Sequence, residues 1–211
     1  MTRPYKSARR TSAAAETRRA VLAAALALFE ERGYVGATLA EIATRAEVAV
    51  NTVYTSVGGK PQLLIELIGE AANNDQIDAS LRRLNSARSG RDVVAEVAEG
   101  TAAVFRDRAW LLGALYDNAG TEPLLTEAVE SAEAAYAARL AEAAARVAAL
   151  GELRDGIDIA TASDILWFYF GFRPWRDLRA RGWSWERAGA WLGAQAGHAL
   201  LAEPPGDAAV L

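Results

Sequence analysis

The feature that most constrains this chain is a pair of short amphipathic segments between residues 38 and 60. Apolar residues recur at helical spacing in both segments: Leu39, Ile42, Ala43 and Ala46, then Val50 and Val53. Thr38 followed three residues later by Glu41 is typical of a capping box at a helix start. The pattern predicts two helices joined by a tight turn, as in a helix-turn-helix that places its second helix in a DNA major groove. A plain helical hairpin has the same pattern, so the segment alone leaves both interpretations open.

A longer amphipathic helix precedes this pair. Its apolar stripe consists of Val21, Leu22, Ala25, Leu26, Leu28 and Phe29. Gly33 follows in the position of a glycine that ends a helix. Three helices in this order predict a small helical head of the kind that binds DNA.

Residues 17–68 resemble the N-terminal DNA-binding domain of the tetracycline-repressor (TetR) family. The shared motifs are the LxLF run from Leu26 to Phe29, Arg32-Gly33-Tyr34, Ala37-Thr38-Leu39, Glu41-Ile42-Ala43, and Thr52-Val53-Tyr54 followed by Lys60. The rest of the chain resembles the family only in helical character and length. The resemblance implies a homodimeric cytoplasmic transcriptional regulator, more often a repressor, that binds a double-stranded DNA operator with an inverted repeat. It also implies release of the DNA by a small-molecule effector.

The chain departs from the family pattern at the turn and around it. Glu47 occupies the turn where the family usually has glycine, so a residue with a side chain must adopt the turn conformation. Ala49 replaces the usual serine at the start of the second helix, which removes a capping hydroxyl worth about 1 kcal/mol. Val57 stands where an aromatic residue is common, and Gly58-Gly59 gives a looser loop before Lys60.

Composition and charge indicate an all-α protein with two functional regions. The chain has 211 residues, 52% of them hydrophobic, and strand patterns are almost absent. Residues 1–60 carry nine Lys and Arg against five Asp and Glu, whereas the remainder carries 14 against 22. This asymmetry favours a basic head that meets phosphates. We expect a disordered basic arm (1–12), a helix-turn-helix domain (13–60), a larger helical ligand-binding and dimerisation body (61–202) and a disordered tail (203–211).

Other classes of protein fit the sequence less well. With no cysteine and a single histidine, His198, we expect no catalytic residues, no metal site and no cofactor. Gly58-Gly59-Lys60 lacks the other residues of a phosphate-binding P-loop. The basic N-terminus before an apolar run imitates a signal peptide, but that run is an amphipathic helix and no stretch of 18 apolar residues occurs, so we expect no membrane partner. A helical protein-binding adaptor without DNA or ligand-sensing activity remains the alternative.

The second helix of the pair supplies the residues expected to meet DNA. The expected DNA-binding residues are Thr38, Ala49, Val50, Asn51, Thr52, Tyr54, Thr55 and Lys60. Asn51 is the best direct reader, because its amide pairs bidentately with adenine, and Val50 and Thr55 are expected to contact bases or a thymine methyl. The family resemblance places Tyr54, Thr38, Thr52 and Lys60 on phosphates. No Arg or Lys lies on this helix, so part of the specificity is expected to come from DNA shape.

The body is expected to contain one helix over 61–84, two over 92–108 and 110–118, one over 121–151, one from 158 to 172 interrupted at Pro174, and a last one from 184 to 201. The resemblance implies that approximately 157–181 and 184–201 form a four-helix bundle with a second copy. The expected ligand-binding residues, on the hypothesis of an apolar or aromatic effector, are Phe105, Trp110, Tyr116, Asn118, Trp167 and Phe170. An ordinary place in the hydrophobic core is the alternative for each.

Overall fold

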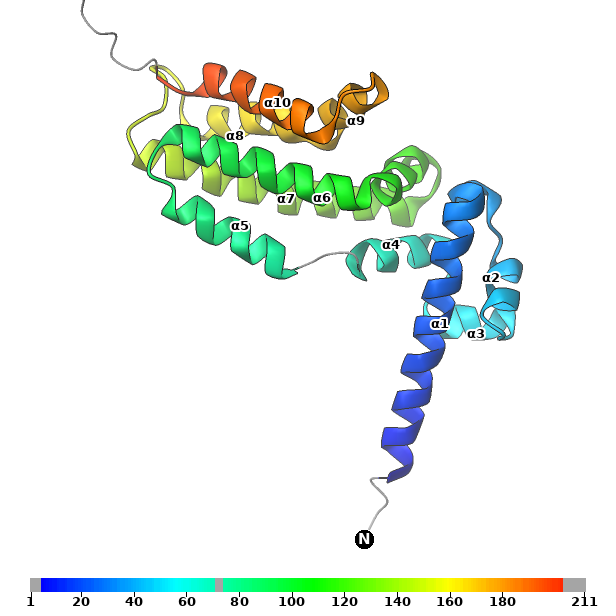
Figure 1. The fold of residues 1–211 in the computed structure, drawn as a ribbon. Coiled ribbons are helices and arrows are strands. Elements are labelled where there is room, and N and C mark those ends of the chain that lie inside the picture. Colours follow the sequence, from blue (N-terminus) through cyan, green and yellow to red (C-terminus); the bar gives the residue numbers. More distant parts are fainter. Residues whose placement is uncertain (1–4, 71–73, 203–211) are drawn as a thin grey trace, which may run out of the picture. The chain divides into compact units, whose positions relative to one another are not determined.

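The computed structural model describes residues 5–70 and 74–202, where every regular element is helical (Figure 1). The predicted all-α class, with its helix-turn-helix head, is confirmed. The elements are α1 (Tyr5–Gly36), α2 (Leu39–Arg45), α3 (Val50–Ser56), α4 (Lys60–Glu70), α5 (Asn74–Ser86), α6 (Gly90–Asn118), the short 3-10 helix η1 (Ala119–Thr121), α7 (Pro123–Ala149), α8 (Ile159–Phe170), α9 (Phe172–Ala180) and α10 (Trp185–Leu200).

The chain divides into two compact units. The first contains Met1–Ala72 and Arg108–Glu130, and the second contains Asn73–Asp107 and Ser131–Leu211. Helices α6 and α7 therefore each contribute residues to both units. In this division α4 belongs to the same unit as the head helices, whereas the boundary expected after residue 60 would assign α4 to the body.

The first unit has one hydrophobic core, built by α1, which packs against α2, α3 and α4. Phe29 and Ile42 are fully buried there, as are Val53 of α3 and Leu63 of α4. Three buried leucines of the α6–α7 segment complete the same core: Leu111, Leu115 and Leu125. Gly33 has a φ of 73° and interrupts the regular α1 helix, as predicted.

Several predicted boundaries differ from the structure. Helix α1 begins at Tyr5, so residues 5–12 are helical rather than a disordered arm, and the alanine-rich sequence that follows favours this extension. Residues 1–4 and the predicted tail, 203–211, lie outside the described residues. Within the single helix predicted over 61–84, the structure describes α4, which ends at Glu70, and α5, which begins at Asn74; residues 71–73 between them lie outside the described residues. The two helices predicted over 92–118 are one helix, α6.

In the second unit, α10 lies beside α8 and α9 (Figure 1). Asp158 begins α8 by accepting a 2.7 Å hydrogen bond from the Thr161 amide, and Ser184 begins α10 in the same way. The interruption predicted at Pro174 instead falls at Gly171, between α8 and α9. A Cβ at Gly171 would lie 2.9 Å from the Trp167 carbonyl oxygen, so the close turn requires a glycine, while a proline is tolerated in the first turn of α9.

Candidate DNA interface and ligand groove

Local hydrogen bonds fix where α2 starts. The Thr38 amide donates to Glu41 Oε2 at 3.1 Å, and the Glu41 amide donates to Thr38 Oγ1 at 3.3 Å, so the predicted capping box is confirmed. These bonds to Thr38, together with the Arg32 guanidinium, hold the pKa of the Glu41 carboxyl below its usual range. The Thr38 hydroxyl also donates to Glu41 Oε2 at 2.8 Å, so its proton must leave Glu41 before it can donate to a phosphate.

The turn between α2 and α3 uses an unusual conformation for its residue type. Glu47 has a φ of 56°, in the left-handed region that the family glycine adopts without strain. The Val48 amide donates to the Ala43 carbonyl at 3.0 Å and closes the turn. Arg45 adds a two-pronged ion pair to Glu31 of α1, with N–O distances of 2.7 and 2.8 Å. The turn is therefore held by a backbone bond inside it and an ion pair beside it.

Helix α3 presents one face to solvent and buries the other. Val53 is fully buried, whereas Tyr54 is 54% exposed and Val50 is 40% exposed. Asn51 and Thr55 are also exposed, and Thr52 is half-buried. Ala49 occupies the N-cap position and makes no side-chain capping bond, as its substitution for serine predicted. The exposed residues thus share the face that a recognition helix turns toward a major groove.

Lys60, which the resemblance places on a phosphate, forms hydrogen bonds within the first unit. Its ammonium donates to the carbonyl oxygens of Tyr34 (2.8 Å), Ala37 (3.1 Å) and Val35 (3.3 Å), at the end of α1. It also lies 4.5 Å from the centroid of the Tyr34 ring. Burial lowers the pKa of this ammonium. All three N–H donors of the ammonium are therefore engaged by backbone carbonyl groups.

Lys60→Met is expected to destabilise the first unit by about 1–3 kcal/mol, because three carbonyl oxygens lose a charged donor. Chemical denaturation of both proteins measures the difference. A direct phosphate contact predicts the opposite combination: unchanged stability with a salt dependence of DNA binding that is smaller by about one counterion.

Tyr34, which contacts Lys60, provides a pH-dependent test of the packing in this region. Burial, with a smaller effect from the Glu122 carboxylate, raises the pKa of the Tyr34 phenol to about 12. The unfolded chain releases this proton near pH 10 and the folded chain retains it, so stability falls as pH rises from 10 to 12, by up to about 2 kcal/mol. The hydroxyl has no hydrogen-bond partner among the described residues.

Tyr34→Phe is therefore expected to be neutral or slightly stabilising at pH 7 and to remove part of the alkaline loss of stability. Equilibrium unfolding of both proteins at pH 9.5 and 11.5 measures the difference. Equal alkaline losses in the two proteins would contradict this origin of the effect.

The six residues expected to bind a ligand are divided between the two units. In the second unit, Phe105, Trp167 and Phe170 belong to an aromatic cluster around Tyr136, whose ring centroid lies 6.4 Å from that of Phe105 and 5.9 Å from that of Trp167. The Tyr136 hydroxyl donates to the Phe170 carbonyl oxygen at 3.2 Å. The other three expected residues lie on the part of α6 that belongs to the first unit: Trp110, Tyr116 and Asn118.

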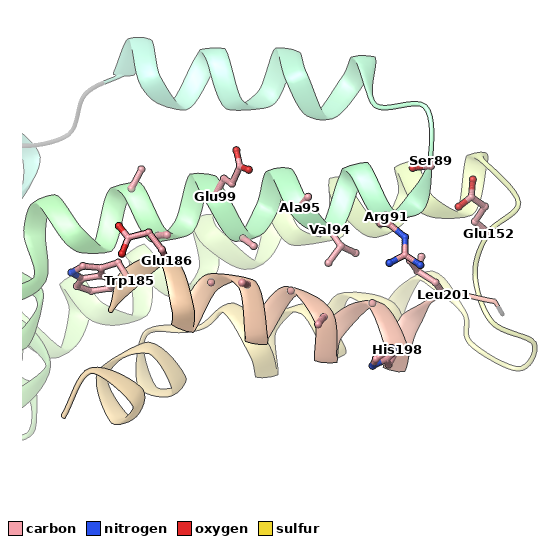
Figure 2. A pocket seen from close by; sticks show the side chains of 18 of the residues that line it. Ser89, Arg91, Val94, Ala95, Glu99, Glu152, Trp185, Glu186, His198 and Leu201 are labelled. Carbon is pink, nitrogen blue, oxygen red and sulfur yellow. The ribbon is translucent and has the colours of Figure 1, made fainter. Parts of the chain in front are cut away.

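A groove of about 1120 Å³ lies elsewhere in the second unit, between α6 and α10 (Figure 2). Its floor carries small side chains, including Ala95 and Ala98 of α6 and Gly193 and Ala194 of α10. The Cβ of an alanine at Gly193 would lie 3.5 Å from Ala98, so the two helices approach closely along it. None of the six expected residues lines this groove. The sequence analysis missed this face; the signal that could have identified it is the spacing of four between the glycines of α10, at 189, 193 and 197.

Charged side chains lie at both ends of the groove, and an aromatic side chain lies at one of them. Figure 2 shows Arg91 and Glu152 near Leu201 at one end, and Trp185 with Glu186 at the other. The Glu152 carboxylate accepts a 2.8 Å hydrogen bond from the Gly90 amide at the start of α6. An apolar floor between polar ends fits an elongated, largely apolar molecule.

The geometry of α2, the turn and α3 defines a helix-turn-helix protein. Residues 21–67 match the family described as bacterial regulatory proteins, tetR family. The helix-turn-helix head of this chain is therefore that of the TetR family of DNA-binding transcriptional regulators.

Individual relatives agree with this assignment. The chain is 31% identical over 149 residues to the HTH-type transcriptional repressor KstR of Mycolicibacterium smegmatis, a match that covers 71% of this chain and 64% of that relative.

Solved structures share the fold. NalD of Pseudomonas aeruginosa, the secondary repressor of the MexAB-OprM multidrug efflux pump, is 22% identical, with a TM-score of 0.69 over 92% of this chain and 100% of its own. FadR of Bacillus subtilis in complex with stearoyl-CoA is 16% identical, with a TM-score of 0.67 over 86% of this chain and 98% of its own. Within the described residues of the present chain, no helix is long and apolar enough to cross a membrane.

Proposed function

We propose that this chain is a repressor that binds an inverted-repeat operator as a homodimer and releases it when a largely apolar ligand binds. The proposal of DNA binding depends on the orientation of α3. Val53 of this helix is buried, whereas Asn51, Tyr54 and Val50 lie on its exposed face. Asn51 would contact adenine, and Tyr54 would contact a phosphate through its hydroxyl. Such a protein acts where bacterial DNA lies, in the cytoplasm.

A selection of bound fragments from random DNA tests this proposal. We expect enrichment of an inverted repeat, because two copies of one recognition helix contact two related half-sites. Tyr54→Phe, which removes only the hydroxyl, should weaken binding to all fragments alike. If the folded protein enriches no sequence at moderate salt, the proposal fails and a protein-binding adaptor becomes the better hypothesis.

The proposed dimer would use the outer faces of α8 and α10. Phe168 of α8 is 69% exposed and Trp191 of α10 is 44% exposed, although both belong to helices whose other faces are buried. Large exposed aromatic side chains are favoured at protein interfaces. They also match the helices that the family resemblance assigned to dimerisation.

Phe168→Asp is expected to raise the dimer dissociation constant at least about tenfold, because a charge replaces an aromatic anchor. Sedimentation equilibrium measures the change. Val35→Asp, at a position 75% exposed in the first unit, is the control and should leave the mass unchanged. A Phe168→Asp protein that dimerises normally would exclude this face.

We place the effector in the groove between α6 and α10, because its floor is apolar and its polar ends would orient a ligand. FadR, which shares the fold, was solved with stearoyl-CoA, so a long acyl ligand is a suitable first probe. Ala194→Leu would fill the groove and Ala180→Leu, on an exposed position of α9, would not. We expect stearoyl-CoA to release labelled operator from the wild type and the Ala180→Leu protein but not from Ala194→Leu. Release from all three proteins alike would exclude the groove.

A further inference from the structure

Arg18 of α1 connects two helices of the proposed DNA interface. Its guanidinium donates to the carbonyl oxygen of Ser56, the last residue of α3, at 3.1 Å. A second nitrogen of the same group lies 2.5 Å from Glu66 Oε2 on α4. The planar guanidinium can hold both partners at once, which an ammonium on a flexible stem cannot do in the same geometry.

Both partners of Arg18 are themselves constrained. Gln62 donates to the other oxygen of Glu66 at 3.2 Å, so the carboxylate is held from one turn earlier on α4. The Ser56 hydroxyl donates to the Val53 carbonyl at 3.1 Å, which ties the end of α3 to the residue that anchors it in the core. A cation beside the C-terminal carbonyl of a helix is also favoured by the helix dipole.

Helix α3 has few other restraints. It contains seven residues, and its N-cap residue makes no side-chain capping bond. Its position therefore depends on the burial of Val53 at its centre and on the Arg18 contact at its end.

We infer that Arg18 is a positioning residue that fixes the recognition helix to α4, so that sequence-specific DNA affinity depends on the Arg18–Glu66 ion pair. This inference rests on the proposed DNA binding. Arg18 thus adds a side-chain link between α3 and α4 to the short loop of residues 57–59 that joins them.

Glu66→Gln distinguishes positioning from simple electrostatics, because the two make opposite predictions. Removing a negative charge from a DNA-binding unit strengthens phosphate attraction and should tighten binding to every DNA. Loss of the ion pair should instead weaken binding to the selected operator by about three- to sixfold and leave non-specific binding equal to that of a variant that loses only the charge. Glu70→Gln is the matched control, since Glu70 is an exposed carboxylate on the same helix.

The experiment measures dissociation constants for the selected operator and for an unrelated duplex over a series of salt concentrations. Arg18→Lys keeps the charge and should lose affinity for the operator as Glu66→Gln does, without a change in salt dependence. The inference is overturned if Glu66→Gln binds the operator as tightly as Glu70→Gln, if Arg18→Lys equals the wild type, or if both duplexes are weakened equally, as a loss of folded protein would cause. A wild type that binds no DNA would instead contradict the proposed function.

Discussion

Trp175→Ala is expected to lower the free energy of unfolding of the second unit by about 3–5 kcal/mol, the usual cost of removing a large buried aromatic side chain. Trp175 is fully buried, and its ring centroid lies 6.3 Å from that of Phe105 and 5.9 Å from that of Trp185. A Cβ at Gly189 of α10 would lie 3.2 Å from the Trp175 ring, so the ring fills the space that this glycine leaves. Truncation would open a cavity between α9, α10 and α6 together.

Denaturant unfolding followed by circular dichroism measures this loss. Trp110→Ala is the control, because Trp110 is 37% exposed and its removal should cost much less. A cost for Trp175→Ala no larger than that for Trp110→Ala would mean that Trp175 is not the centre of the α9–α10 packing.

Asn51→Ala is expected to reduce affinity for the selected operator by about 1–3 kcal/mol and to relax the sequence preference at one base pair of each half-site. The reason is the position of Asn51 at the exposed start of α3, where recognition-helix residues reach base edges. Repeating the fragment selection with the variant measures both effects. If Asn51→Ala selects the same sequence with the same affinity, the contact to adenine is excluded and shape readout becomes the main source of specificity.

The head was predictable because its determinants are local. Thr38 and Glu41 lie three residues apart, and a capping box needs only that spacing. The apolar period of α1 and α3 likewise places Phe29 and Val53 inside without knowledge of the rest of the chain. The same pattern predicted the turn; the resemblance added that Glu47 stands there in place of glycine, and the structure shows Glu47 with a positive φ.

Contacts between residues far apart in the sequence were not predicted. Lys60 is the first residue of α4, but its partners are carbonyl groups 23 to 26 residues earlier, which no local pattern reveals. The ligand prediction was based on large aromatic residues, of which Phe105 and Phe170 are buried in the core. The groove, in contrast, is lined mainly by small residues. Small residues leave space, and a search for large apolar side chains overlooks it.

The three leucines that close the core of the first unit bear on how such regulators can be recombined. Leu111, Leu115 and Leu125 are contributed by a segment that begins about forty residues after α4 ends, and they are buried among the head helices. The head is therefore not a module that a single cut can transplant. A chimaera that joins these head helices to another sensor domain must include residues 108–130 as well. Otherwise the new domain must be redesigned to cover the apolar surface that these residues bury.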